Sequence, residues 1–161
     1  MAKKEIKIVR KDKLLAGYNG NLESVIIHDA SGEPVEATNG VFVTVGELMN
    51  VSHPREVVYA KLADANDVEE DVLLIHNAEV MYDERLYKLE DYRIEAGKVA
   101  RAYRLYDGDI ITLTEDLFAE PVSVGDKLAV KANGLLGKVA EGVTPKVEFT
   151  VFEDCGNELH I

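Results

Sequence analysis

Three observations predict an all-β fold, a small antiparallel β-barrel or sandwich. Short runs rich in Val, Ile, Thr, Tyr and Phe recur along the 161-residue chain, and turn dipeptides such as Asn-Gly and Asp-Gly separate them. No alternation of strands with long helices is visible, which argues against an α/β fold. Because 47% of the residues are hydrophobic, the chain has enough apolar side chains for one folded domain with a substantial core.

The first half of the chain contains the predicted strands 24–29, 41–45, 56–61 and 72–76. The last of these is apolar up to its final His76, which indicates a strand buried on both faces. Helical turns are expected over 46–50 and over 82–92, where Tyr82, Leu86 and Leu89 follow helical spacing. The predicted fold therefore includes one short helix.

The second half is organised around residues 99–151. Asp107-Gly108 and Asn133-Gly134 each separate two strand-like runs, which predicts hairpins closed by type I′ turns with positive φ. Near the end of this stretch Val147, Phe149 and Val151 alternate with Glu148 and Thr150. This period of two predicts that the apolar members face the core.

Charge is distributed unevenly. The formal net charge is -12, yet residues 1–13 hold six basic and two acidic residues, a net of +4, which leaves -16 on the remainder. We divide the chain into a basic N-terminal arm, 1–22, and a β-rich body, 23–161. The apolar residues between the lysines are consistent with a short edge strand, an extended arm or a solvated terminus. If the arm binds an acidic partner, the candidate residues are Lys3, Lys4, Ile6, Lys7, Ile8, Arg10, Lys11 and Lys13.

Composition excludes several functional classes. A surface this acidic repels the phosphate backbones of nucleic acids. We therefore expect no nucleic-acid partner. No apolar run approaches the ~20 residues that span a bilayer, so no membrane partner is expected, and no secretory signal is visible. The single cysteine, Cys155, excludes an internal disulfide framework and a Cys-based zinc cluster. Folding in a reducing cytoplasm is the expectation.

No catalytic, metal or cofactor site is predicted. The acidic loop 64–71 clusters oxygen ligands of the kind calcium requires, but it lacks the EF-hand pattern, which favours a solvated loop. The four histidines are scattered without zinc-site spacing, and nucleotide-binding and nucleophile motifs are absent. Arg101 and Tyr103 alternate with Arg104 and Tyr106, which places each pair on its own face and favours arginines paired with carboxylates.

Several segments carry a resemblance to a known class of proteins: His76 to Tyr82, Asp91 to Lys98 and Arg101 to Ile110. They resemble head-associated structural proteins of tailed phages of Gram-positive bacteria. The later runs Val124 to Leu128 and Asn133 to Gly142 are similar to the Gly-Asp and Gly strands of capsid cement proteins. The resemblance covers residues 70–142 best. It implies a small β-rich protein without catalytic residues that binds the outside of an assembled shell.

Two functions from different classes are consistent with the sequence. The first is a non-enzymatic capsid decoration protein, made in the host cytoplasm and located on the virion surface. Its partners would be the major capsid protein and neighbouring copies of itself, and it would need no cofactor. The second is an intracellular β-barrel enzyme or small-ligand-binding protein, with a site assembled from separated Asp, Glu, His and Tyr residues.

Overall fold

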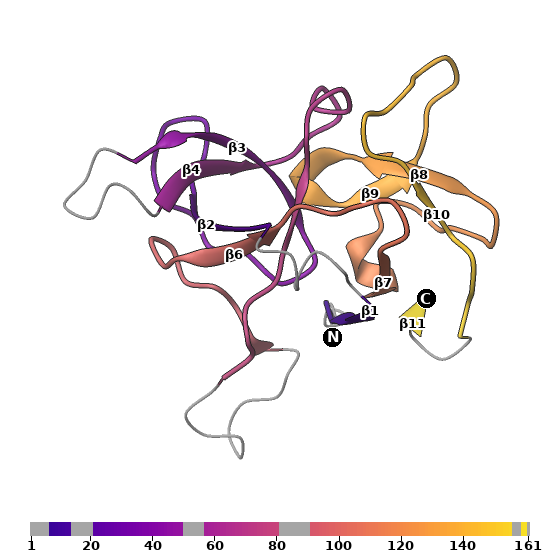
Figure 1. Cartoon of the computed structure of the whole chain (residues 1–161), viewed down its shortest axis with the longest axis horizontal. Coiled ribbons are helices and arrows are strands. Elements are labelled where there is room, and N and C mark those ends of the chain that lie inside the picture. The colour runs from indigo at the N-terminus through magenta and orange to yellow at the C-terminus, as the bar shows by residue number, and fades with distance from the viewer. Residues whose placement is uncertain (1–6, 14–20, 50–56, 81–90, 156–158, 161) are drawn as a thin grey trace, which may run out of the picture.

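The computed structural model describes residues 7–13, 21–49, 57–80, 91–155 and 159–160, and these are arranged as an almost all-β protein (Figure 1). Five strands close into a barrel in the order β2-β4-β3-β5-β6, and two three-stranded sheets, β1-β7-β11 and β10-β8-β9, lie beside it. The barrel strands are β2 (Leu22–Ile27), β3 (Phe42–Leu48), β4 (Val57–Leu62), β5 (Leu73–Ile75) and β6 (Ala100–Tyr103). The others are β1 (Val9–Lys13), β7 (Ile110–Thr114), β8 (Lys127–Val130), β9 (Leu136–Lys138), β10 (Phe149–Thr150) and β11 (Leu159–His160).

The barrel contains the predicted strands of the first half of the chain. Its neighbouring strands are antiparallel except β2 and β4, which run parallel. The uniformly apolar run around residue 74 forms β5, and all three of its residues are fully buried. The prediction of a strand buried on both faces is therefore confirmed. Because neither face of such a strand meets solvent, its residues do not alternate between apolar and polar.

The two further sheets share one hydrophobic core with the barrel. Leu113 on β7, Leu128 on β8 and Leu136 on β9 belong to the same buried cluster as the barrel residues Phe42 and Leu74. The alternation over 147–151 is confirmed, because Val147 and Phe149 are half-buried, Val151 is buried, and the residues between them are exposed. The C-terminal third of the chain therefore packs onto the barrel as part of the same folded unit.

The Asn133-Gly134 hairpin is confirmed in full. Asn133 has φ 60° and Gly134 has φ 69°, as a type I′ turn requires, and the flanking strands β8 and β9 are paired. A 3-10 turn, η4 (Ala132–Gly134), coincides with this tip. The tip lies on the barrel: the Gly134 N–H donates a hydrogen bond to the Ala63 carbonyl at 2.8 Å, and a Cβ at Gly134 would lie 2.4 Å from the Phe42 carbonyl oxygen.

The prediction of a hairpin at Asp107-Gly108 is wrong. Gly108 does have positive φ, 94°, and the Asp109 N–H closes the turn on the Tyr106 carbonyl at 3.0 Å. However, Asp107 has no positive φ, and the strands on either side belong to different sheets, β6 to the barrel and β7 to the β1-β7-β11 sheet. The turn therefore redirects the chain from one β unit to the other, because each strand finds its hydrogen-bonding partners elsewhere in the chain.

Other local expectations have mixed outcomes. Residues 46–48 continue strand β3, so the helical turn expected over 46–50 is wrong there. The other expected helical segment, 82–92, lies mostly outside the described residues. A 3-10 turn that was not expected, η3 (Glu115–Leu117), buries Leu117 completely. Within β6, Ala100 and Ala102 are buried and Arg101 is exposed, whereas Tyr103, which alternation places on the face of Arg101, is buried as well.

Part of the N-terminal arm belongs to the fold. Strand β1 pairs antiparallel with β7, with Val9 opposite Leu113, and the Val9 side chain is buried. Before it, Ile8 and Thr114 are linked by hydrogen bonds in both directions. Of the alternatives considered for the arm, an edge strand describes residues 9–13, and Leu22 is the first residue of barrel strand β2.

We predict that Gly134→Ala destabilises the protein far more than Gly108→Ala. Both changes put a side chain at positive φ, at about 1–2 kcal/mol each, but only the first places Cβ against the Phe42 backbone. Nothing lies within 4 Å of a Cβ at Gly108. Overpacking should add about 1–3 kcal/mol at Gly134, measured by urea unfolding. Equal losses for the two variants would contradict the proposed docking contact.

Candidate interaction groove

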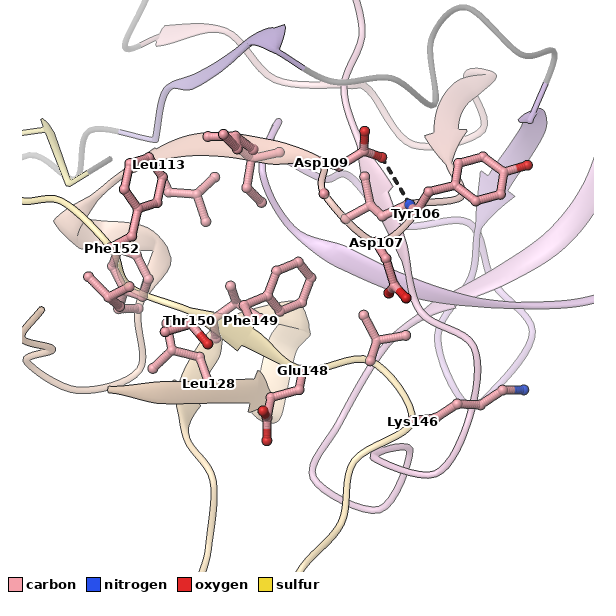
Figure 2. A pocket seen from close by; sticks show the side chains of 18 of the residues that line it. Tyr106, Asp107, Asp109, Leu113, Leu128, Lys146, Glu148, Phe149, Thr150 and Phe152 are labelled. Atoms are coloured by element: carbon pink, nitrogen blue, oxygen red, sulfur yellow. Dashed lines mark hydrogen bonds between the residues drawn. The ribbon is translucent and has the colours of Figure 1, made fainter. Parts of the chain in front are cut away.

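A groove of about 470 Å³ lies between two chain segments, Leu105–Leu113 and Lys146–Phe152. The first leads from the barrel into β7, and the second contains β10. In Figure 2, Tyr106, Asp107 and Asp109 lie toward one end of the groove, and Leu113 and Phe152 toward the other. The groove thus follows the boundary between the β1-β7-β11 sheet and the β10-β8-β9 sheet.

The floor of the groove is apolar. Leu113 and Leu128 are buried at its base, and Phe149 contributes a half-buried ring that packs on Phe42 with centroids 5.3 Å apart. Phe152 is 51% exposed, which is unusual for a large aromatic side chain next to a core. Exposed aromatic side chains beside a buried apolar floor are typical of protein-binding surfaces.

The rim of the groove is acidic. Four carboxylates line it against one lysine: Asp71, Asp107, Asp109, Glu148 and Lys146. Two of the acids are held by ion pairs. Asp71 contacts Arg104 at 3.2 Å and Lys146 at 3.1 Å, and Glu148 contacts Lys127 at 2.8 Å.

Arg104 joins this rim to the barrel. Its guanidinium donates to Glu23 on β2 at 2.6 Å and to Asp71 at 3.2 Å. The hydrogen bond with Glu23, together with the charges of Glu23 and Asp71, raises the pKa of Arg104, although burial acts in the opposite direction. The expectation that arginine in this stretch pairs with carboxylates is confirmed for Arg104. The link runs from β2 through Asp71 to Lys146 and so anchors the chain that enters β10.

The opposite wall is fixed by the turn at 106–109. The Tyr106 N–H donates to the Asp109 carboxylate at 2.9 Å, and the Tyr106 hydroxyl accepts a hydrogen bond from the Asn21 side chain. Tyr106 is nevertheless 45% exposed. These contacts tie the wall to its own turn and to the entrance of β2, so the groove is bounded by ordered backbone on both sides.

Strand β10 is an edge strand of its sheet, and its free edge faces the groove. Val151 directs both backbone groups toward the β8 side, with its N–H on the Asp126 carbonyl and its C=O on the Gly125 N–H. Because backbone groups alternate direction along a strand, Glu148 and Thr150 direct theirs to the other edge. Both residues line the groove, and β10 is paired with β8 alone in the described sheets.

The acidic loop 64–71 uses its carboxylates within the fold. Asp67 is 7% exposed and accepts hydrogen bonds from the Lys61 ammonium and the Asp64 N–H, each at 2.9 Å. Its hydrogen bond raises the pKa of Lys61, partly offset by desolvation. The Asp64 carboxylate accepts from the Asn66 N–H. Across the described part of the chain, no group of three His, Cys, Asp or Glu residues is arranged to hold a metal ion.

His28 and His76 lie outside the lining of the groove. His28 is buried at the end of β2, with Nδ1 2.9 Å from the Ile26 carbonyl and its ring against Tyr59. His76 is buried after β5, where its ring meets Tyr103 edge to face. Both histidines lie at the ends of barrel strands. Cys155 is an exposed free thiol.

A buried amide also organises the barrel end that includes His76. Asn39, 2% exposed, donates to the Asn77 carbonyl and accepts from the Asn77 N–H, at 3.0 and 2.9 Å. The Asn77 side chain in turn donates to the Val99 carbonyl and accepts from the Arg101 N–H. The Asn39-Gly40 turn signal was visible in the sequence, but this polar link was not, because it joins residues 38 positions apart.

The predicted partner-binding residues lie only partly within the described chain. Lys3, Lys4 and Ile6 are outside it. Lys7 and Ile8 precede β1 and are half-buried, and Arg10, Lys11 and Lys13 are part of β1. The groove itself was missed, since its walls come from segments about 40 residues apart. The alternation of apolar and polar residues over 147–151 was the sequence signal present in one wall.

Comparison with protein-family models, with curated proteins and with solved structures gave no match to this chain. Among the described residues, no helix has the length and apolar character needed to cross a membrane.

We predict that Asp67→Asn lowers stability by about 1–2 kcal/mol, because the carboxylate accepts from both Lys61 and the loop backbone. Glu69→Gln, at an exposed position of the same loop, is the matched control and should change stability by less than about 0.5 kcal/mol. Thermal unfolding measured with and without millimolar calcium should give the same midpoint. A calcium-dependent rise that Asp67→Asn abolishes would show that the loop is a cation site.

Proposed function

We propose that this chain is a non-enzymatic structural protein that binds the outside of an assembled phage capsid and stabilises it, as a decoration or cement protein. The observation that carries the proposal is the groove beside β10, where a strand edge without a partner among the described strands, exposed aromatic rings and an acidic rim adjoin. An available strand edge of this kind is a common acceptor for another protein chain. The sequence resemblance over residues 70–142 suggests that this other chain is a capsid subunit.

The construction of the protein supports a binding role. Barrel and sheets share one hydrophobic core, so the groove is supported by buried side chains from both β units. A rigid platform loses little conformational entropy on binding, which favours attachment to a fixed shell. The acidic surface would keep a decorated particle soluble. The proposed partners are the major capsid protein and neighbouring copies of this chain.

The basic N-terminal residues are proposed as a second contact. Residues 3–13 include six of the chain's basic side chains, and β1 is at the edge of its own sheet. Because β1 pairs with β7 and Val9 is buried, the contribution of this segment to binding is better tested by charge reversal than by deletion. Exposed ion pairs mainly steer and register a contact.

A small-ligand-binding role is the second candidate. The groove volume falls within the range of about 300–1,000 Å³ typical of small-molecule sites, and Tyr106 and several carboxylates line it. Against this role, Asp71 and Glu148 are engaged in ion pairs, and neither buried histidine lines the groove. A carboxylate that acts as a catalytic or ligand-binding group needs to contact the bound molecule, and these ion pairs oppose that contact.

We predict that the protein co-sediments with empty shells assembled from the major capsid protein of its source phage. Decorated shells should also withstand heating to a higher temperature than bare shells, since binding to the assembled state stabilises that state. Unassembled capsid subunits provide the control and should bind more weakly, because a shell offers many neighbouring sites. Protein that remains in the supernatant at all shell concentrations would refute the proposed function.

We predict that the paired change Lys3→Glu with Lys4→Glu weakens shell binding and makes it less sensitive to salt. The melting temperature should stay at the wild-type value, because these residues precede the paired strand β1. The loss should shrink between low and high ionic strength as screening increases. Unchanged affinity at low salt would show that the basic segment is a solvated terminus.

A further inference from the structure

We propose that the groove beside β10 binds an extended peptide segment whose apolar side chains alternate with basic ones, and that this segment adds as a strand to the free edge of β10. The inference rests on the proposed function and deepens it, because it names the chemistry of the shell subunit that this face would contact. It is built from three features of the groove: its backbone, its floor and its rim.

The backbone fixes the form of the occupant. Glu148 and Thr150 direct their N–H and C=O groups away from β8, toward the groove, as the hydrogen bonds of Val151 on the other side require. Residues 146–152 line this wall, and the regular strand among them is the two-residue β10, Phe149–Thr150. A short extended peptide can pair with the outward backbone groups of Glu148 and Thr150, whereas a compact ligand cannot.

The floor of the groove accounts for the apolar side chains of the proposed peptide. Phe149, Leu113 and Leu128 lie beneath the edge, and the exposed ring of Phe152 borders it. An added strand presents every second side chain to the same face. Its inward side chains would therefore cover this apolar floor, while the intervening ones would reach the rim.

The rim fixes the other half of the pattern. Asp71 and Glu148 are paired with Arg104, Lys146 and Lys127, so the exposed carboxylate of Asp107 on the facing turn is the rim charge that favours a cation at an intervening position. A second copy of this chain is a less suitable donor. Its own basic segment is engaged from Ile8 onward, through the Thr114 hydrogen bonds and the pairing of β1 with β7.

The first test uses a fluorescent eight-residue peptide of alternating Val and Lys, with a Val and Glu peptide as its opposite, and fluorescence anisotropy on the full chain. The lysine peptide should bind and the glutamate peptide should bind at least about tenfold more weakly, because its carboxylates would meet an acidic rim. Equal binding of both peptides, or none of either, would overturn the inference.

Three variants locate the contact. Thr150→Pro removes an N–H from the free edge of β10, a position where proline is compatible with an edge strand, and should weaken binding about tenfold. Phe152→Ala removes apolar area, and Asp107→Lys reverses a rim charge and should cost about fivefold. Glu36→Lys makes the same charge change at an exposed position outside the groove and should leave peptide affinity unchanged.

The variants then separate this inference from the proposed function. If wild-type protein binds shells and the three groove variants bind them equally well, the groove is not the contact, although the function stands. If wild-type protein binds the lysine peptide but no shell, the groove is a peptide site and the shell-binding function fails. Dimerisation of the full chain that Thr150→Pro abolishes would assign the groove to a second copy instead.

Discussion

The arrangement of this protein depends on one close backbone contact, between the tip of the β8–β9 hairpin and barrel strand β3. Gly134 meets the Phe42 backbone where no side chain can fit, and its N–H is bonded to Ala63. A similar approach occurs at Gly40, where a Cβ would collide with Leu117 and Val9. These two glycines let the β units approach closely enough to share one core. Phe42 then packs against Phe149, so the same contact positions β10 and its groove.

The structural features that depend on neighbours along the chain were predicted from the sequence, whereas those that depend on distant residues were missed. The all-β class, the buried run around Leu74 and the type I′ turn at Asn133-Gly134 follow from local composition and spacing. The turn at Gly108 was also recognised, but its strands pair with distant segments, so the predicted hairpin was wrong. The parallel pairing of β2 with β4 has no local signal, because it depends on how the whole barrel closes.

Only parts of the candidate groove could be predicted from the sequence. The alternation over Val147, Phe149 and Val151 predicted the core-facing residues of a segment that forms one wall, but it did not predict a groove there. The facing wall at Tyr106 and Asp107 could not be assigned, because the closest approach of two segments is set by the fold. The basic terminus also serves the fold, since residues 9–13 complete a sheet within their own chain.

Amide hydrogen exchange with and without assembled shells tests the central claim most directly. If a partner strand adds to the free edge of β10, exchange at Glu148 and Thr150 should slow strongly on shell binding. Val151, whose N–H is already bonded to Asp126, should show a much smaller change. Unchanged exchange at Glu148 and Thr150 in protein that is fully shell-bound would contradict the account, because the β10 edge would then be free in the complex.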